Sequence, residues 1–66
     1  MPMGSRHDET GLLRWERGTL ILLRDEGGRW RLETGRRAET MVGRRVRIVG
    51  TRVGFDLLAV SKIEPC

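Results

Sequence analysis

The chain has 66 residues and a net charge of +4, with 38% hydrophobic and 33% charged residues. A chain of this length forms one small domain that buries only about 60% of its unfolded surface. This excludes a second domain and most enzymes that need a deep cleft. No apolar run approaches the roughly 18 residues of a membrane span. Residues 1–10 contain no apolar signal region, so we predict a cytoplasmic protein with no membrane partner.

The positive charge comes almost entirely from arginine, since Lys62 is the only lysine. This balance suits a nucleic acid, an anionic membrane surface or an acidic protein as partner, although the codon usage of a GC-rich genome produces the same arginine excess. Cys66 is the only cysteine and cannot form a disulfide within the chain. The cysteine usage therefore favours a reducing compartment.

Short apolar runs alternate with glycine signals along most of the chain, which is typical of a small all-β barrel. Residues 1–9 show no such pattern and are predicted to be a flexible lead-in, followed by a single barrel domain over residues 10–64. The predicted strands are residues 11–15, 19–24, 29–33, 44–49 and 55–63.

The turn Asp25-Glu26-Gly27-Gly28 is the clearest hairpin signal in the chain. A loop of two or four residues there places Ile21 and Leu23 on the same face as Trp30 and Leu32. A loop of three residues exchanges the two faces of the preceding strand. We adopt the first register, which puts Ile21 and Leu23 in the core.

Residues 34–43 lack strand alternation, and Ala38, Met41 and Val42 recur at helical spacing. We predict one short helix of about two turns here, with Gly43 near its end. The predicted fold is therefore an all-β, five-stranded OB-like (Greek-key) small barrel with one short helix between strands 3 and 4. An SH3-like barrel is the main rival, although it usually has no helix at this point.

Strand alternation also predicts which side chains fill the barrel. The predicted core is Leu13, Trp15, Ile21, Leu23, Trp30, Leu32, Met41, Val46, Ile48, Phe55 and Leu57. Leu20 and Leu22 then lie on the outside of an otherwise apolar strand. Exposed apolar area of this kind is typical of an interface, so we predict that these two leucines bind a protein partner or a second copy of the chain.

Several segments resemble a family of small uncharacterised bacterial proteins with a domain of unknown function. They are Gly11-Leu12-Leu13, Gly28-Arg29-Trp30-Arg31-Leu32, Gly43-Arg44-Arg45-Val46-Arg47, Gly50-Thr51-Arg52 and Phe55-Asp56-Leu57-Leu58-Ala59-Val60. The resemblance covers most of residues 10–63 and implies an OB-type barrel. It implies no activity, cofactor or binding residue.

The sequence offers little material for catalysis. His7 is the only histidine and lies in the predicted lead-in, so no serine or cysteine triad can be placed on ordered structure. His7, Asp8 and Glu9 are adjacent and cannot converge on a metal as tetrahedral ligands do. We therefore expect no enzyme, no metal site and no cofactor.

Binding of single-stranded nucleic acid is the alternative function, because arginine donates paired hydrogen bonds to phosphate and stays charged. The predicted outward-facing arginines are Arg14, Arg24, Arg29, Arg31, Arg45 and Arg47. Aromatic platforms for bases are missing, since Trp15 and Trp30 are assigned to the core. Such binding is expected to be weak, sensitive to salt and nonspecific for sequence.

Overall fold

Five strands and one 3-10 helix make up the computed structural model, which describes residues 4–66 except the side chains at positions 36 and 37. The elements are β1 (Arg6–Glu16), β2 (Thr19–Arg24), β3 (Arg29–Glu33), η1 (Arg36–Met41), β4 (Arg45–Arg52) and β5 (Leu57–Pro65). The bounds of β2 and β3 agree with the prediction, and β1 begins earlier. Residues 6–9, which we assigned to the lead-in, belong to β1 and pair with β4.

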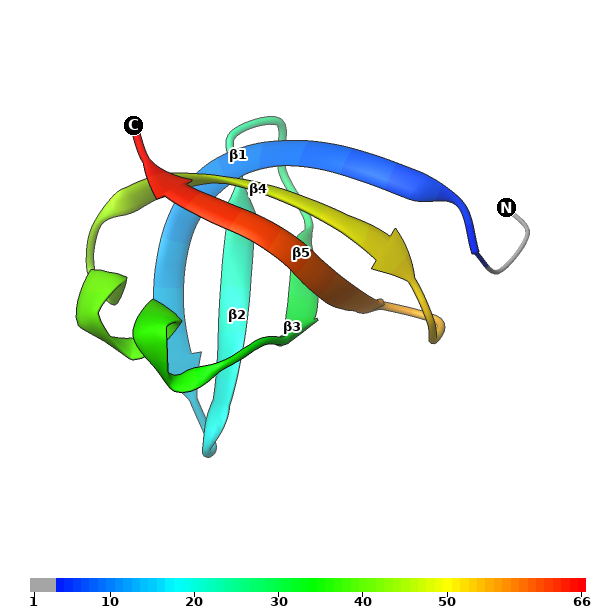
Figure 1. The fold of residues 1–66 in the computed structure, drawn as a ribbon. Coiled ribbons are helices and arrows are strands. Elements are labelled where there is room, and N and C mark those ends of the chain that lie inside the picture. The colour runs from blue at the N-terminus through cyan, green and yellow to red at the C-terminus, as the bar shows by residue number, and fades with distance from the viewer. Residues whose placement is uncertain (1–3) are drawn as a thin grey trace.

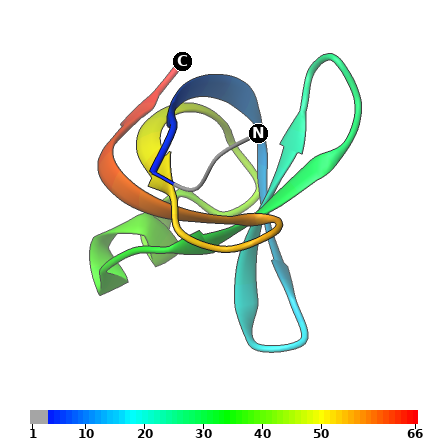
Figure 2. The ribbon, with the colours of Figure 1, turned by 90° about the vertical axis from the view of Figure 1, so that its right-hand side faces the viewer.

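The five strands form one sheet that closes on itself in the order β1-β2-β3-β5-β4, with β4 returning to β1. The pairing of β3 with β5 is parallel, and the other pairings are antiparallel. β1 and β4 curve across the top of the molecule, and η1 lies beside one end of the barrel (Figure 1). The β1–β2 and β2–β3 turns extend in opposite directions (Figure 2).

β1 closes the barrel because it pairs with two strands in succession. Its first part pairs with β4 and its second part with β2, and Gly11 pairs with both, opposite Arg24 and Val46. A Cβ atom built on Gly11 would lie 2.0 Å from the carbonyl oxygen of Leu23. Only glycine therefore lets the β1 and β2 backbones approach this closely.

The β2–β3 hairpin has a three-residue loop. The backbone N–H of Arg24 donates to the carbonyl of Gly28 at 3.0 Å, and that of Gly27 donates to the carbonyl of Arg24 at 3.0 Å. Gly27 and Gly28 both have positive φ, at 99° and 83°, which glycine adopts without a steric cost. Two successive glycines thus allow the register that we did not adopt.

This register turns the leucines of β2 toward the inside. Leu22 pairs with Trp30, and Leu20 pairs with Leu32. Leu22 is 0% exposed and Leu20 is 6% exposed, so the predicted outward orientation of these two residues is wrong.

The core lies inside the barrel, where the inward-facing side chains of the five strands meet. The buried cluster consists of Leu13, Leu20, Leu22, Leu32, Ala38, Val46, Ile48 and Leu58. Trp30 and Met41 pack against it and are partly buried, in agreement with their predicted place. Ala38 and Met41 come from η1, so the helix covers one end of the core.

Several predicted core residues lie elsewhere. Trp15 and Phe55 are 49% and 84% exposed. Ile21, Leu23 and Leu57 alternate with inward-facing neighbours and lie on the outer face of the barrel. Ile21 is nevertheless buried, because it pairs with Arg14 on one side and Arg31 on the other, and long arginine stems can cover an apolar neighbour.

The segment between β3 and β4 is helical, as predicted, but it is a 3-10 helix. The N–H of Ala38 donates to the carbonyl of Gly35, which is three residues earlier and forms the N-cap. Gly43 follows the helix with a φ of 87°, which suits a glycine that ends a helical segment. The tight helix brings the chain from β3 to β4 across the end of the barrel.

The register predicts that two neighbouring leucines contribute unequally to the free energy of unfolding. Leu22→Ala should lower the free energy of unfolding by about 2–5 kcal/mol, which is comparable to the roughly 3–5 kcal/mol that a core of this size supplies. Leu23→Ala, on the outer face, should cost about 1 kcal/mol. Urea unfolding followed by circular dichroism measures both. A folded Leu22→Ala beside an unfolded Leu23→Ala would contradict the register.

Barrel closure predicts that Gly11→Ala unfolds the protein or shifts its urea midpoint by more than any exposed substitution, because the new methyl group collides with backbone. Gly18→Ala is the control. Gly18 lies in the β1–β2 turn with a φ of 78°, and no atom lies close to its Cβ position. It should cost about 1 kcal/mol from backbone strain alone. Equal midpoints for the two variants would rule out the close approach at Gly11.

Candidate functional site

The arginines predicted to bind nucleic acid are mostly ion-paired. The pairs are Arg24–Glu9, Arg29–Glu16, Arg31–Asp56, Arg45–Asp25 and Arg47–Asp8. Arg14 is exposed and makes no ion pair with any side chain that the structure describes. Five of the six predicted arginines therefore have a carboxylate partner, which a phosphate would have to displace.

Arg24 differs from the other five because it does not face outward. It follows Leu20 and Leu22 in the alternation of β2, and its Nε donates to Glu9 Oε1 at 3.0 Å. The side chain of Glu9 is only 17% exposed. The prediction that Arg24 points away from the barrel is thus wrong for the same reason as that for the two leucines.

The ion pair between Arg47 and Asp8 on the outer surface is held by two hydrogen bonds. Arg47 donates from Nε and Nη2 to the two carboxylate oxygens of Asp8, at 2.9 and 2.5 Å. These hydrogen bonds hold the pKa of Asp8 below its ordinary value of 3.8 and raise the pKa of Arg47. The same kind of contact with Asp25 raises the pKa of Arg45.

His7 is part of β1 and not of a free lead-in. Its ring lies 4.9 Å from that of Trp30, and its Nε2 is 2.9 Å from Ser5 Oγ. On the other side, Nδ1 is 3.6 Å from Glu9 Oε2, which is too long for a hydrogen bond. Because a catalytic triad needs the carboxylate to orient the ring, these three residues do not form one.

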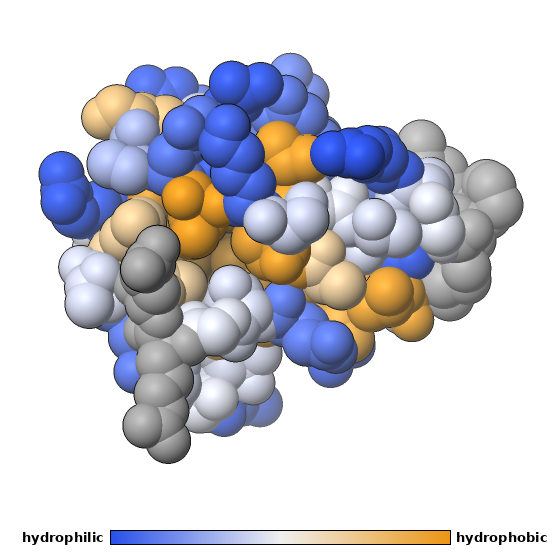
Figure 3. Space-filling view, viewed as in Figure 1, coloured by the Kyte–Doolittle hydropathy of each residue, from blue (hydrophilic) through white to orange (hydrophobic). Residues whose placement is uncertain are grey.

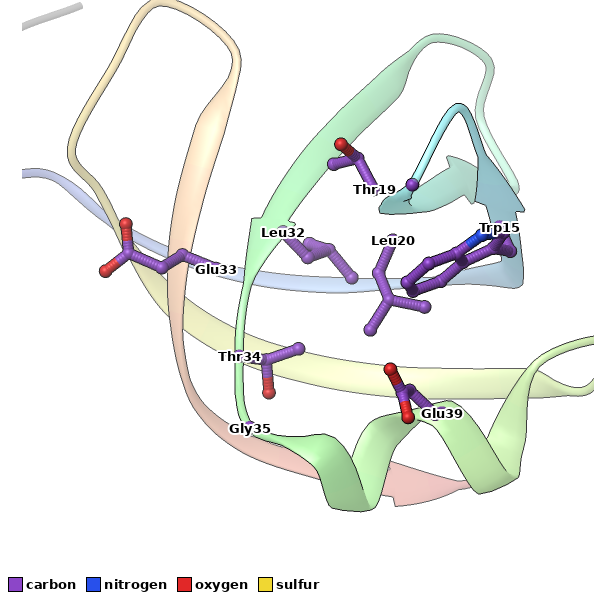
Figure 4. Close-up of a pocket in the computed structure, with 9 residues that line it drawn as sticks. Trp15, Thr19, Leu20, Leu32, Glu33, Thr34, Gly35 and Glu39 are labelled. Carbon is purple, nitrogen blue, oxygen red and sulfur yellow. The ribbon is translucent and has the colours of Figure 1, made fainter.

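A groove at the opposite end of the barrel is the site we single out. It lies between the β1–β2 turn and η1, has a volume of about 350 Å³ and contains one exposed indole (Figure 4). Its lining residues are Trp15, Gly18, Thr19, Leu20, Leu32, Glu33, Thr34, Gly35 and Glu39. We call this the Trp15 groove.

The groove exists because β1 extends beyond its partner β4. Trp15 has the same parity as Leu13, as predicted, but β4 pairs with β1 no further than Leu12. From Leu13 onward, η1 and the turn after it lie at this side, and Gly43 N–H donates to the carbonyl of Leu13 at 2.7 Å. No strand covers the indole of Trp15, which remains half exposed.

The charges in the Trp15 groove are unlike those of the remaining surface. Of the nine acidic residues, Glu33 and Glu39 are the two that make no ion pair with any described side chain. No arginine or lysine is found in the lining among the side chains that the structure describes. An adjoining hollow of about 250 Å³ is lined by Trp15, Glu39 and Val42, so the indole and the Glu39 carboxylate border both spaces.

A second hollow of about 400 Å³ lies on the outer face of β2 and β3. It is lined by Glu16, Arg17, Thr19, Ile21, Arg29 and Arg31. Phe55 is exposed in the β4–β5 loop with the Arg52 guanidinium 5.9 Å from its ring centre, and its neighbour Asp56 pairs with Arg31 at 2.7 Å. The carboxylates of Glu16 and Asp56 partly neutralise the arginines here.

Apolar side chains are also exposed outside the groove, at Leu12, Val53 and Phe55. On the face seen in Figure 3, apolar atoms come to the surface near the middle and hydrophilic side chains border them. None of the helices in residues 4–66 has the length and apolar character needed to cross a membrane. Within the same described residues, no cluster of His, Cys, Asp and Glu is arranged to hold a metal ion.

A family profile described as "Protein of unknown function (DUF5818)" matches residues 10–66. The chain belongs to this family. Comparison with curated proteins and with solved structures gives no match. The DUF5818 region contains the whole Trp15 groove, and the match confirms the resemblance to an uncharacterised family.

Sequence reasoning found the position of Trp15 on its strand but missed the groove. The alternation of Leu13 and Trp15 shows which face of the strand carries the indole, but it does not show where β4 ends. Glu33 ends β3 and Glu39 lies within η1, and the groove between them depends on where η1 packs against the barrel.

The lowered pKa of Asp8 predicts how stability depends on pH in this DUF5818 chain. The pair with Arg47 stabilises the fold at pH values above 3.8, and that contribution is lost as the pH falls through the lowered pKa of the folded state. Asp8→Asn should therefore lower the melting temperature at neutral pH and reduce the loss on acidification. Glu33→Gln, which removes a carboxylate that pairs with no described side chain, is the control for the loss of one negative charge. Identical acid limbs for wild type and Asp8→Asn would contradict this assignment.

Proposed function

We propose that this chain is a non-enzymatic binding module of the cytoplasm, built on an OB-type barrel, that holds a segment of a partner protein in the Trp15 groove. The OB assignment is supported by the strand order β1-β2-β3-β5-β4, by the parallel β3–β5 pairing and by a helical segment between β3 and β4. A reducing compartment is supported by the single cysteine, Cys66, which is free and exposed.

The exposure of Trp15 is the observation that carries this proposal. A tryptophan buries a large apolar area when a partner covers it, and tryptophan is enriched among the residues that dominate interface energies. Leu20 and Leu32 form an apolar floor beside the indole, and Glu33 and Glu39 supply a polar rim. An apolar centre with a polar rim is the usual anatomy of a protein interface.

Single-stranded nucleic acid is less well supported as the ligand. A phosphate on the β2–β3 face would have to displace Glu16 from Arg29 and Asp56 from Arg31, whose ion pairs measure 2.8 and 2.7 Å. The exposed Phe55 does supply one ring on which a base could stack. One ring beside paired arginines supports only weak binding that is sensitive to salt.

A random peptide display library tests the proposal. The wild-type protein is immobilised and bound peptides are selected, with Trp15→Ala present in solution as a competitor to remove peptides that bind elsewhere. We expect enriched peptides whose affinity falls at least tenfold in Trp15→Ala, since truncating a central tryptophan commonly costs more than 1 kcal/mol. Fluorescence anisotropy of the labelled peptides measures the affinities.

Phe55→Ala is the matched control, because Phe55 is the other strongly exposed aromatic residue and lies outside the groove lining. Its affinity for the selected peptides should equal that of wild type. Thermal melting confirms that both variants are folded. If no peptide is enriched, or if every enriched peptide binds Trp15→Ala as well as wild type, the groove is not a protein-binding site.

A further inference from the structure

We propose that the Trp15 groove recognises one arginine side chain of the partner, with the guanidinium stacked on the indole of Trp15 and paired with the carboxylate of Glu39. This inference rests on the proposed function and names the chemistry of the ligand. The two side chains come from β1 and η1 and border both hollows at this end of the barrel.

Trp15 offers a surface that suits a cation. The indole lies beside Leu20, which also lines the groove. Trp15 is 49% exposed. Tryptophan is the best aromatic partner for a cation positioned over its ring within about 6 Å. Among the residues whose side chains the structure describes, no arginine or lysine lines the groove.

Glu39 supplies the negative charge at the right place. Figure 4 shows its carboxylate reaching from η1 toward Leu20 and Trp15, whereas Glu33 points to the other side, away from the indole. Neither carboxylate has an ion-pair partner among the described residues, although the chain pairs each of its other acids. A cation bound between Trp15 and Glu39 would complete the pattern found over the remaining surface.

Arginine fits this arrangement better than lysine. Its planar guanidinium stacks flat on an aromatic ring and still presents N–H donors at its edge to a carboxylate. It is also less strongly hydrated than an ammonium group, so less hydration is lost on entering a groove with an apolar floor. Lysine can satisfy the charge but has no planar face to stack.

The net charge of the protein restricts the sequence around the bound arginine. The chain carries +4, and Arg17 in the β1–β2 turn is exposed next to Gly18, which lines the groove. A polybasic segment would be repelled by this surrounding charge. We therefore infer a single arginine with neutral or acidic neighbours, and a polybasic tract is not the expected ligand.

The test uses three short peptides that differ at one position. The parent is acetyl-Gly-Ala-Arg-Ala-Gly-amide, and the others carry citrulline or lysine in place of arginine. Citrulline has the shape of arginine without its charge. Each is titrated at millimolar concentration into labelled wild-type protein, and nuclear magnetic resonance follows the indole N–H of Trp15. We expect the arginine peptide to bind about fivefold or more tightly than the citrulline peptide, with lysine between them.

Paired protein variants locate the charge. Glu39→Gln should weaken the arginine peptide about threefold to fivefold and leave the citrulline peptide unchanged, because only the charged ligand uses the carboxylate. Glu33→Gln is the control and should change neither affinity. Both substitutions keep the size and exposure of the side chain, so the fold is expected to be retained.

The outcomes separate this inference from the function on which it rests. Equal binding of the arginine and citrulline peptides, or no binding of either, overturns the arginine assignment. If peptides from the display library still depend on Trp15 in that case, the protein-binding function stands alone. Sedimentation of the wild type should show a monomer. A self-association that Trp15→Ala abolishes would make a second copy the occupant and overturn the choice of a separate partner.

Discussion

The close approach of two backbones at Gly11 is the constraint on which the remaining structure depends. β1 begins its pairing with β2 at this residue while it is still paired with β4, and the carbonyl of Leu23 occupies the position that a side chain would need. The sheet can close only because β1 makes both pairings. The same transition carries the end of β1 past β4, so that Trp15 lies beyond the closed part of the barrel and faces η1.

The order of the elements follows from the sequence, but the faces of β2 do not. β2 and β3 have the predicted bounds because turn residues delimit them on both sides. Residues 20–23 are all apolar, so alternation carries no information about which of them face inward. The decision then falls to the loop before β3, where Gly27 and Gly28 permit more than one loop length. The pairing of β2 with β1 and β3 fixes the register that buries Leu20 and Leu22.

The candidate site was less predictable than the fold, since its determinants are distant in sequence. Arg47 pairs with Asp8 across 39 positions, and Arg31 pairs with Asp56 across 25. Arginine content alone therefore could not reveal that five of the six predicted arginines have a carboxylate partner. Glu33 and Glu39, which pair with no side chain that the structure describes, stand out only by contrast with those pairs. Glu39 borders the groove because η1 lies beside the exposed indole.

β5 connects β3 to β4 in the sheet, because it pairs parallel with β3 and antiparallel with β4. During synthesis on the ribosome, the meander of β1, β2 and β3 can assemble from neighbouring hairpins as it emerges. Leu58, which is fully buried, arrives only with residues 57–65. The leucines of β1 and β2 therefore stay partly uncovered until residues 57–65 are synthesised and β5 has paired, and unpaired strand edges and exposed apolar side chains favour misassembly during that interval.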